Sequence, residues 1–99
     1  MTITDPVAPE ALVLWCRADR VLWRRTLGGV VVLPTQRTTE PVALRGPAAM
    51  IWELLAEPLR AADLLESLAA TYGVGAHEVA ADVAGALDLL LELGALCRD

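Results

Sequence analysis

The chain has 99 residues, the size of one small domain, and 56% of them are hydrophobic. No apolar run approaches the roughly 18 residues that span a bilayer, and the first twelve residues lack the basic start and apolar stretch of a signal peptide, so we expect a cytoplasmic protein with no membrane contact. The net charge is −5, and residues 46–99 hold nine acids against two arginines, which argues against a nucleic-acid partner.

Residues 1–11 are proline-rich and lack periodicity, which is typical of a flexible tail, and residues 12–99 are expected to form one domain. After the tail, the chain has short alternating or β-branched apolar segments that are separated by turn residues, and this pattern predicts strands. The predicted strands are Arg20–Thr26, Val30–Pro34 and Val42–Arg45, with Gly28-Gly29 as a hairpin turn between the first two. Ala11–Cys16 is either a further strand or the lead-in to the first one.

From Gly46 onward the apolar residues follow a helical period. A first helix is expected with Gly46 as cap, Pro47 in its first turn and Pro58 as its stop. The second covers Arg60–Tyr72 and ends at Gly73, and the third begins near Gly75 and ends at Gly94. The core stripes are predicted to be Ala48, Ile51, Trp52 and Leu55, then Ala61, Leu64, Leu65, Leu68 and Tyr72, then Val79, Val83, Ala86, Leu87 and Leu90.

The third helix carries more apolar residues than one core-facing stripe needs. Leu89 and Leu91 fall on opposite flanks of the stripe, and Gly85 sits mid-helix, where glycine costs about 1 kcal/mol relative to alanine. Two interpretations stay open: a broad core stripe in a very small domain, or apolar surface that is left for a partner. Three strands followed by three helices predict an α+β fold.

Residues that could carry chemistry are few and isolated. His77 is the sole histidine, Ser67 has no partner in view inside the second helix, and no metal-ligand spacing or phosphate-binding loop is present. Cys16 and Cys97 are far apart in sequence, so reduced thiols are favoured over a disulfide or a reactive thiol, and these alternatives remain open. The sequence therefore predicts a protein that is not an enzyme and that needs no cofactor or metal.

Three recognition functions remain. A winged-helix DNA-binding regulator would need basic residues on a helix, whereas the second and third helices carry mainly acids. A peptide-binding protein needs an exposed strand edge beside an apolar groove, which Val42–Arg45 and the third helix could provide. A subunit that dimerises through the apolar third helix is the other alternative.

The order of segments resembles the PqqD-like family, the recognition elements of ribosomally synthesised and post-translationally modified peptides (RiPPs), over about residues 20–97. The family segment "LN-x-x-A-x-x-IW-x-LL" is matched by Leu44, Ala48, Ile51, Trp52, Leu54 and Leu55. Its later segment "DV-x-x-x-L-x-x-L-x-x-x-G-x-L" is matched by Asp82, Val83, Leu87, Leu90, Gly94 and Leu96. The chain departs from the pattern at Arg45, where asparagine is usual, at Arg60, where a Ser or Thr cap is usual, and at Ala86, where a larger apolar residue is usual. We expect a weak cap at Arg60.

The resemblance implies a winged-helix-like fold, a three-stranded antiparallel sheet packed on three helices, in a free-standing non-catalytic chaperone. Such a protein binds the leader of a precursor peptide as a strand added to the third strand, beside the third helix. It presents the precursor to a leader peptidase and a cyclase, as in lasso-peptide systems, or to a radical-SAM enzyme, as in quinone-cofactor systems. The implied peptide-binding residues are Thr39, Glu40, Val42, Ala43, Leu44, Arg45, Val79, Asp82, Val83, Ala86 and Leu90, with Gly85 and Leu89 in reserve. For Asp82, a hydrogen bond purely within the domain is an open alternative.

Overall fold

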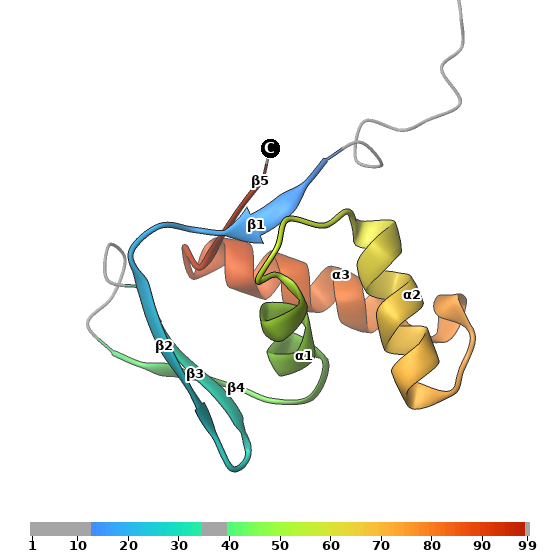
Figure 1. Cartoon of the computed structure of the whole chain (residues 1–99), viewed down its shortest axis with the longest axis horizontal. Helices are drawn as coiled ribbons and strands as arrows, with labels where there is room; N and C mark the ends of the chain where they lie inside the picture. Colours follow the sequence, from blue (N-terminus) through green and yellow to red (C-terminus); the bar gives the residue numbers. More distant parts are fainter. Residues whose placement is uncertain (1–12, 35–39, 99) are drawn as a thin grey trace, which may run out of the picture.

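The computed structural model describes residues 13–34 and 40–98, so the expected tail and Thr39 lie outside the described residues. The elements run β1 (Trp15–Arg17), β2 (Val21–Thr26), β3 (Gly29–Pro34), β4 (Val42–Leu44), α1 (Gly46–Leu54), α2 (Ala61–Tyr72), α3 (Ala76–Glu92) and β5 (Leu96–Arg98). A three-stranded antiparallel sheet has the order β2-β3-β4, and β1 pairs with β5 in a separate two-stranded sheet (Figure 1). The predicted α+β class is confirmed. None of the described helices combines the length and apolarity required to cross a bilayer.

The predicted β2–β3 hairpin is present, but its turn lies at Leu27-Gly28, one residue before the expected Gly28-Gly29, because Gly29 already pairs with Thr26 in the strand ladder. Gly29 has a φ of 151°, and a Cβ at this position would overlap the carbonyl oxygen of Leu44. Only glycine therefore allows β4 to close onto the start of β3. The same sheet is continued by β4 in antiparallel register, with Leu44 opposite Val30.

The core lies between one face of this sheet and the three helices. The predicted stripe of α3 is confirmed, because Val79, Val83, Ala86, Leu87 and Leu90 are all buried. In α1, Trp52 and Ile51 have no exposed surface, so Trp52 is a core residue. Figure 1 shows α1 between the sheet and α2, with α3 passing behind α1. The packing of α1 on α3 therefore sets where the end of β4 lies relative to α3.

Several predicted boundaries need correction. α1 ends at Leu54, before the stop expected at Pro58, and Arg45 is its N-cap in place of Gly46. Gly46 has a φ of 57°, which only glycine adopts readily, and it makes the sharp turn from β4 into the helix. Ala11, the start of the possible strand Ala11–Cys16, lies outside the described residues; within the described part, the strand begins at Trp15 and continues to Arg17. Its partner is β5, a three-residue strand that the sequence pattern did not predict.

Two further details concern the helix ends. Tyr72 is 47% exposed, although it was predicted in the core stripe of α2, because the last turn of that helix extends beyond the core. The side chain of Arg60 makes no cap hydrogen bond, as expected, but the Asp63 carboxylate accepts one from the Arg60 backbone N–H at 3.1 Å. At α3, Glu78 accepts from the backbone N–H of Gly75 at 2.8 Å. Acidic side chains thus stabilise both helix starts.

Candidate functional site

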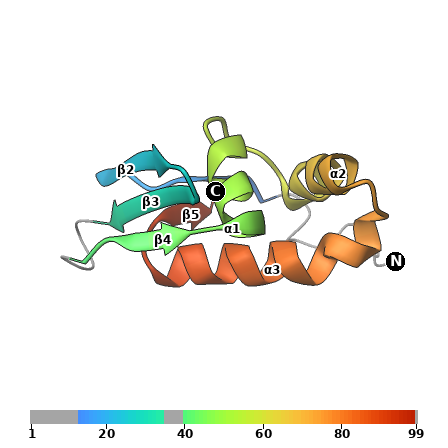
Figure 2. The ribbon, with the colours of Figure 1, turned by 90° about the horizontal axis from the view of Figure 1, so that it is seen from below.

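The strand β4 forms one edge of the three-stranded sheet. It pairs with β3 along Val42–Leu44, and no described strand pairs with its other side. Figure 2 shows β4 as the strand of this sheet drawn nearest to α3. An unpaired edge presents backbone N–H and C=O groups that a further strand can bond.

The carbonyl of Leu44 establishes which groups of β4 point to this open edge. It lies where a Cβ on Gly29 would be, so it points toward β3. Paired residues of antiparallel strands alternate between those that exchange both hydrogen bonds with the partner and those whose polar groups point away. Since Leu44 and Val42 bond toward β3, the N–H and C=O of Ala43 point to the open edge.

A shallow hollow of about 300 Å³ opens where the end of β4 meets α1 and α3. It is lined by Arg45, Pro47 and Ala48 on one side and by Ala81, Asp82, Gly85, Ala86 and Leu89 of α3 on the other. Most of the lining residues are small, and a Cβ added to Gly85 would meet no described neighbour within 4 Å. The floor of the hollow is therefore open helix surface, and Gly85 does not mark a close approach by another element of the described fold.

A second hollow of about 470 Å³ continues the first along α3. It is lined by Pro47, Tyr72, Val74, Glu78, Val79 and Asp82, and so shares Pro47 and Asp82 with the first. We call the combined surface, from Leu89 to Glu78, the α3 groove. Leu89 and Val74 are 43% and 39% exposed, which gives the groove an apolar surface that packing within the described fold leaves uncovered.

The predicted strand residues occupy different environments. Glu40 and Ala43 are exposed, Val42 is half-buried, and Leu44 is a core residue. Arg45 is exposed and stands at the end of the α3 groove nearest β4.

The predicted helix residues divide into groove and core. Asp82 lines both hollows, Ala86 lines the first and Val79 the second. Leu90 is fully buried, and Val83 is buried and borders a separate hollow between α3 and α2. The groove thus brings together Arg45, Val79, Asp82 and Ala86 but not Val83 or Leu90.

Other groove residues were not predicted or were held in reserve. Gly85 and Leu89, which were held in reserve, both line the groove. In the sequence they stood out as a glycine inside a helix and a leucine outside the core stripe. Tyr72 and Val74 were missed, although two large apolar residues that flank the helix-ending Gly73 are a usable signal. Ala81 was missed because a small residue on an exposed helix face gives no pattern.

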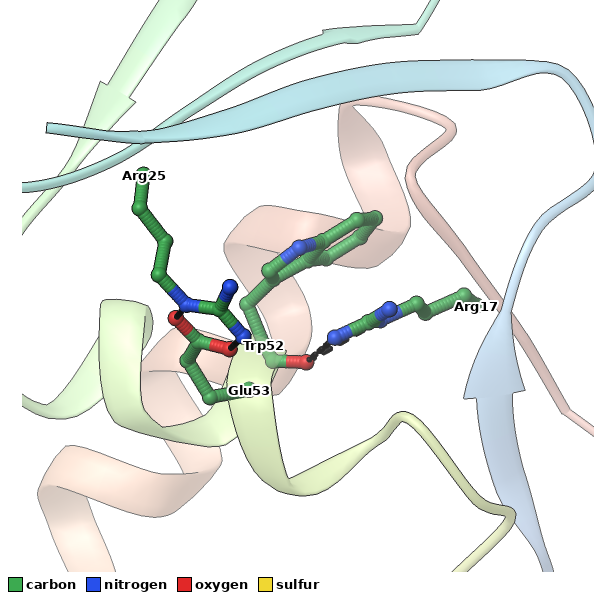
Figure 3. A network of polar contacts seen from close by, with 4 residues as sticks. All are labelled: Arg17, Arg25, Trp52 and Glu53. Atoms are coloured by element: carbon green, nitrogen blue, oxygen red, sulfur yellow. Dashed lines mark hydrogen bonds and ion pairs between the residues drawn. The ribbon is translucent and has the colours of Figure 1, made fainter.

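Arg17 of β1 fixes the C-terminal end of α1 (Figure 3). Its Nη2 and Nε atoms donate to the carbonyl oxygen of Trp52 at 2.6 and 3.1 Å, and its guanidinium stacks over the rings of Trp52 and Trp23 at 4.6 and 4.7 Å. A cation at this end complements the helix dipole and satisfies a carbonyl that has no partner within the helix. Burial lowers the pKa of Arg17, but an arginine remains charged at neutral pH.

Arg25 of β2 holds the same turn of α1 from the sheet side (Figure 3). Its Nε and Nη2 atoms donate to the two Glu53 oxygens at 2.6 and 2.8 Å, and these hydrogen bonds raise the pKa of Arg25. Trp23 packs edge-on against Trp52 at a centroid distance of 6.0 Å. Residues of β1 and β2 thus hold the C-terminal end of α1. Pro47, at the N-terminal end of the same helix, lines the groove.

The charge of α3 bears on the DNA-binding alternative. Its exposed charged residues are acids, among them Asp82, Asp88 and Glu92, and the helix contains no lysine or arginine. A helix that enters a DNA groove carries basic residues for the phosphates. The charge of α3 therefore suits a protein or peptide partner better than a duplex.

Comparison with known families gives one match. A family model described as "Coenzyme PQQ synthesis protein D (PqqD)" matches residues 29–96, which include β4, the three helices and the α3 groove. No curated protein and no solved structure matches the chain.

Proposed function

The chain belongs to the PqqD family, and on this premise we propose that it binds the leader of a ribosomally made precursor peptide at β4 and the α3 groove. Members of the family are non-catalytic, peptide-binding accessory proteins of RiPP biosynthesis. The observation that carries the proposal is the open edge of β4, which ends at an uncovered apolar groove.

The leader binds as an antiparallel strand along β4. The N–H and C=O of Ala43 exchange hydrogen bonds with it, because they point away from β3. Side chains on one face of the added strand reach the α3 groove, and alternate side chains point elsewhere. The backbone supplies affinity for any extended chain, and the groove selects which chain binds.

The lining of the groove defines the chemistry of the leader. Leu89, Tyr72 and Val74 offer exposed apolar surface to apolar leader side chains. Asp82 lies between the two hollows and accepts a hydrogen bond from the leader backbone or from a basic side chain. The bound segment is thus mainly apolar, with one donor group at the level of Asp82.

The protein then delivers the bound precursor to modifying enzymes. These are a leader peptidase and a cyclase in a lasso-type pathway, or a radical-SAM enzyme in a quinone-cofactor type. The genes beside this one distinguish the two, because each pathway needs its own enzymes and a short precursor peptide.

The test replaces Ala43 by proline, which removes the outward N–H and fills the edge with a ring. Because that N–H is not part of the β3–β4 ladder, the fold should survive. The affinity for a synthetic peptide covering the N-terminal half of the neighbouring precursor should fall at least about tenfold, the loss of one or two hydrogen bonds. Ala43→Val keeps the N–H and should bind normally. Affinity is measured by calorimetry and folding by circular dichroism.

Amide hydrogen exchange gives a second measurement that needs no variant. The Ala43 amide should exchange fast in the free protein and become protected when the peptide is added, whereas Val42 and Leu44 should be protected in both states. Unchanged exchange at Ala43, together with unchanged affinity after substitution at all three positions, would exclude strand addition at β4.

A further inference from the structure

The two cysteines, 81 positions apart in the sequence, face each other across the β1–β5 pair. Cys16 and Cys97 are direct register partners, and their Sγ atoms lie 2.7 Å apart. Figure 1 shows the two strands side by side. Opposite residues of antiparallel strands have Cα atoms about 4.5 or 5.5 Å apart, and both values lie within the roughly 4.4–6.8 Å that a disulfide spans. The backbone is thus already in place for a bond.

We propose that Cys16 and Cys97 form a dithiol site that a small-molecule disulfide, such as glutathione disulfide, oxidises to an intramolecular bond. The bond joins β1 to β5 and so closes the described fold near both of its ends. This site is separate from β4 and the α3 groove, since neither cysteine lines that groove.

Exposure sets the order of the exchange steps. Cys97 is exposed and Cys16 is half-buried, so the Cys97 thiolate attacks one sulfur of glutathione disulfide first. A mixed disulfide forms at Cys97 and one glutathione thiolate leaves. The Cys16 thiolate then attacks the Cys97 sulfur, and the second glutathione leaves. The two cysteines lose two electrons to the glutathione disulfide, and their two protons end on the released glutathione thiols.

The bond closes a loop that contains the three-stranded sheet and all three described helices. The β1–β5 pair has only three residues in each strand, yet β1 carries Arg17, which holds the end of α1. A disulfide that closes so long a loop restricts the unfolded chain strongly. The oxidised protein should therefore melt roughly 10 °C or more above the reduced protein.

The first test follows the thiols in glutathione buffers of stepped oxidised-to-reduced ratio, quenched by alkylation and read by intact mass. The expected product is a monomer lighter by two hydrogens that resists alkylation. Cys16→Ser should instead accumulate a single glutathione adduct on Cys97, because the resolving thiol is missing. Lasting adducts or disulfide-linked dimers in the unsubstituted protein, or two alkylatable thiols in excess glutathione disulfide, would overturn the proposal.

The second test is thermal melting of the oxidised protein before and after a phosphine reductant. The melting temperature should fall on reduction, and the variant with both Cys16→Ser and Cys97→Ser should not respond to the reductant. Equal melting temperatures before and after reduction would show that the bond does not constrain the fold. Both experiments are done without peptide, so their failure would leave the proposed leader binding untouched.

Discussion

Replacing Gly85 by alanine should stabilise the protein and weaken peptide binding at the same time. Gly85 does not have a positive φ, and an added Cβ meets no described neighbour within 4 Å. Because alanine is favoured over glycine inside a helix, the free energy of unfolding should rise by about 0.5–1 kcal/mol and the melting temperature by roughly 2–8 °C. A peptide seated in the α3 groove would meet the new methyl group. Overpacking costs about 1–3 kcal/mol, so the Kd should rise roughly 5- to 150-fold.

The assay combines thermal melting with titration of a fluorescent leader peptide. Gly85→Leu should weaken binding further, and Ala84→Leu is the matched control, because Ala84 faces the separate hollow beside α2 and should leave affinity unchanged. If Gly85→Leu binds as tightly as the unsubstituted protein, the peptide does not occupy the groove. If Gly85→Ala lowers the melting temperature, the floor of the groove is not open as described.

Two further predictions concern the scaffold. Arg17→Ala removes two charge-assisted hydrogen bonds to the Trp52 carbonyl, so the free energy of unfolding should fall by about 1.5–3 kcal/mol in urea titrations. A change below about 0.5 kcal/mol would show that Arg17 does not hold the end of α1. Gly29→Ala places a Cβ on the Leu44 carbonyl and should lower the free energy of unfolding by more than about 2 kcal/mol in the same titration. Gly28→Ala is the control: the nearest contact of its Cβ is a flexible side chain 3.8 Å away, so the free energy of unfolding should be nearly unchanged.

The helices were predicted well because each has a periodic apolar stripe and a glycine near an end. The stripe of α3 was correct at every position, and the turn from β4 into α1 was visible as Gly46-Pro47. The pairing of β1 with β5 was not predictable, because it joins residues about 80 positions apart and each strand is too short to show alternation. Because this pairing was not predicted, nothing in the sequence indicated that Cys16 and Cys97 lie opposite each other.

The strand and the helix that border the candidate groove were predicted, but the residues that line the groove were predicted only in part. Periodicity distinguishes core residues from surface residues on a helix. Val83 and Leu90 were among the expected peptide-binding residues because they lie on the third helix, but the fold buries both. Pro47 of α1 and Ala81 of α3 line the groove because the two helices face each other there, and this depends on how the helices cross. No local pattern carries that information.

The length of β4 has a consequence for self-association. An open strand edge is a hazard, because it accepts a neighbouring copy as readily as a specific partner. With only Val42–Leu44 in the strand, and Gly46 turning the chain away directly afterwards, two copies meeting edge to edge would share a ladder three residues long. Such a short ladder does not hold two molecules together without added side-chain contacts. The brevity of β4 therefore disfavours edge-to-edge pairing of copies, and under the proposed function the edge binds a chain whose side chains also fill the α3 groove.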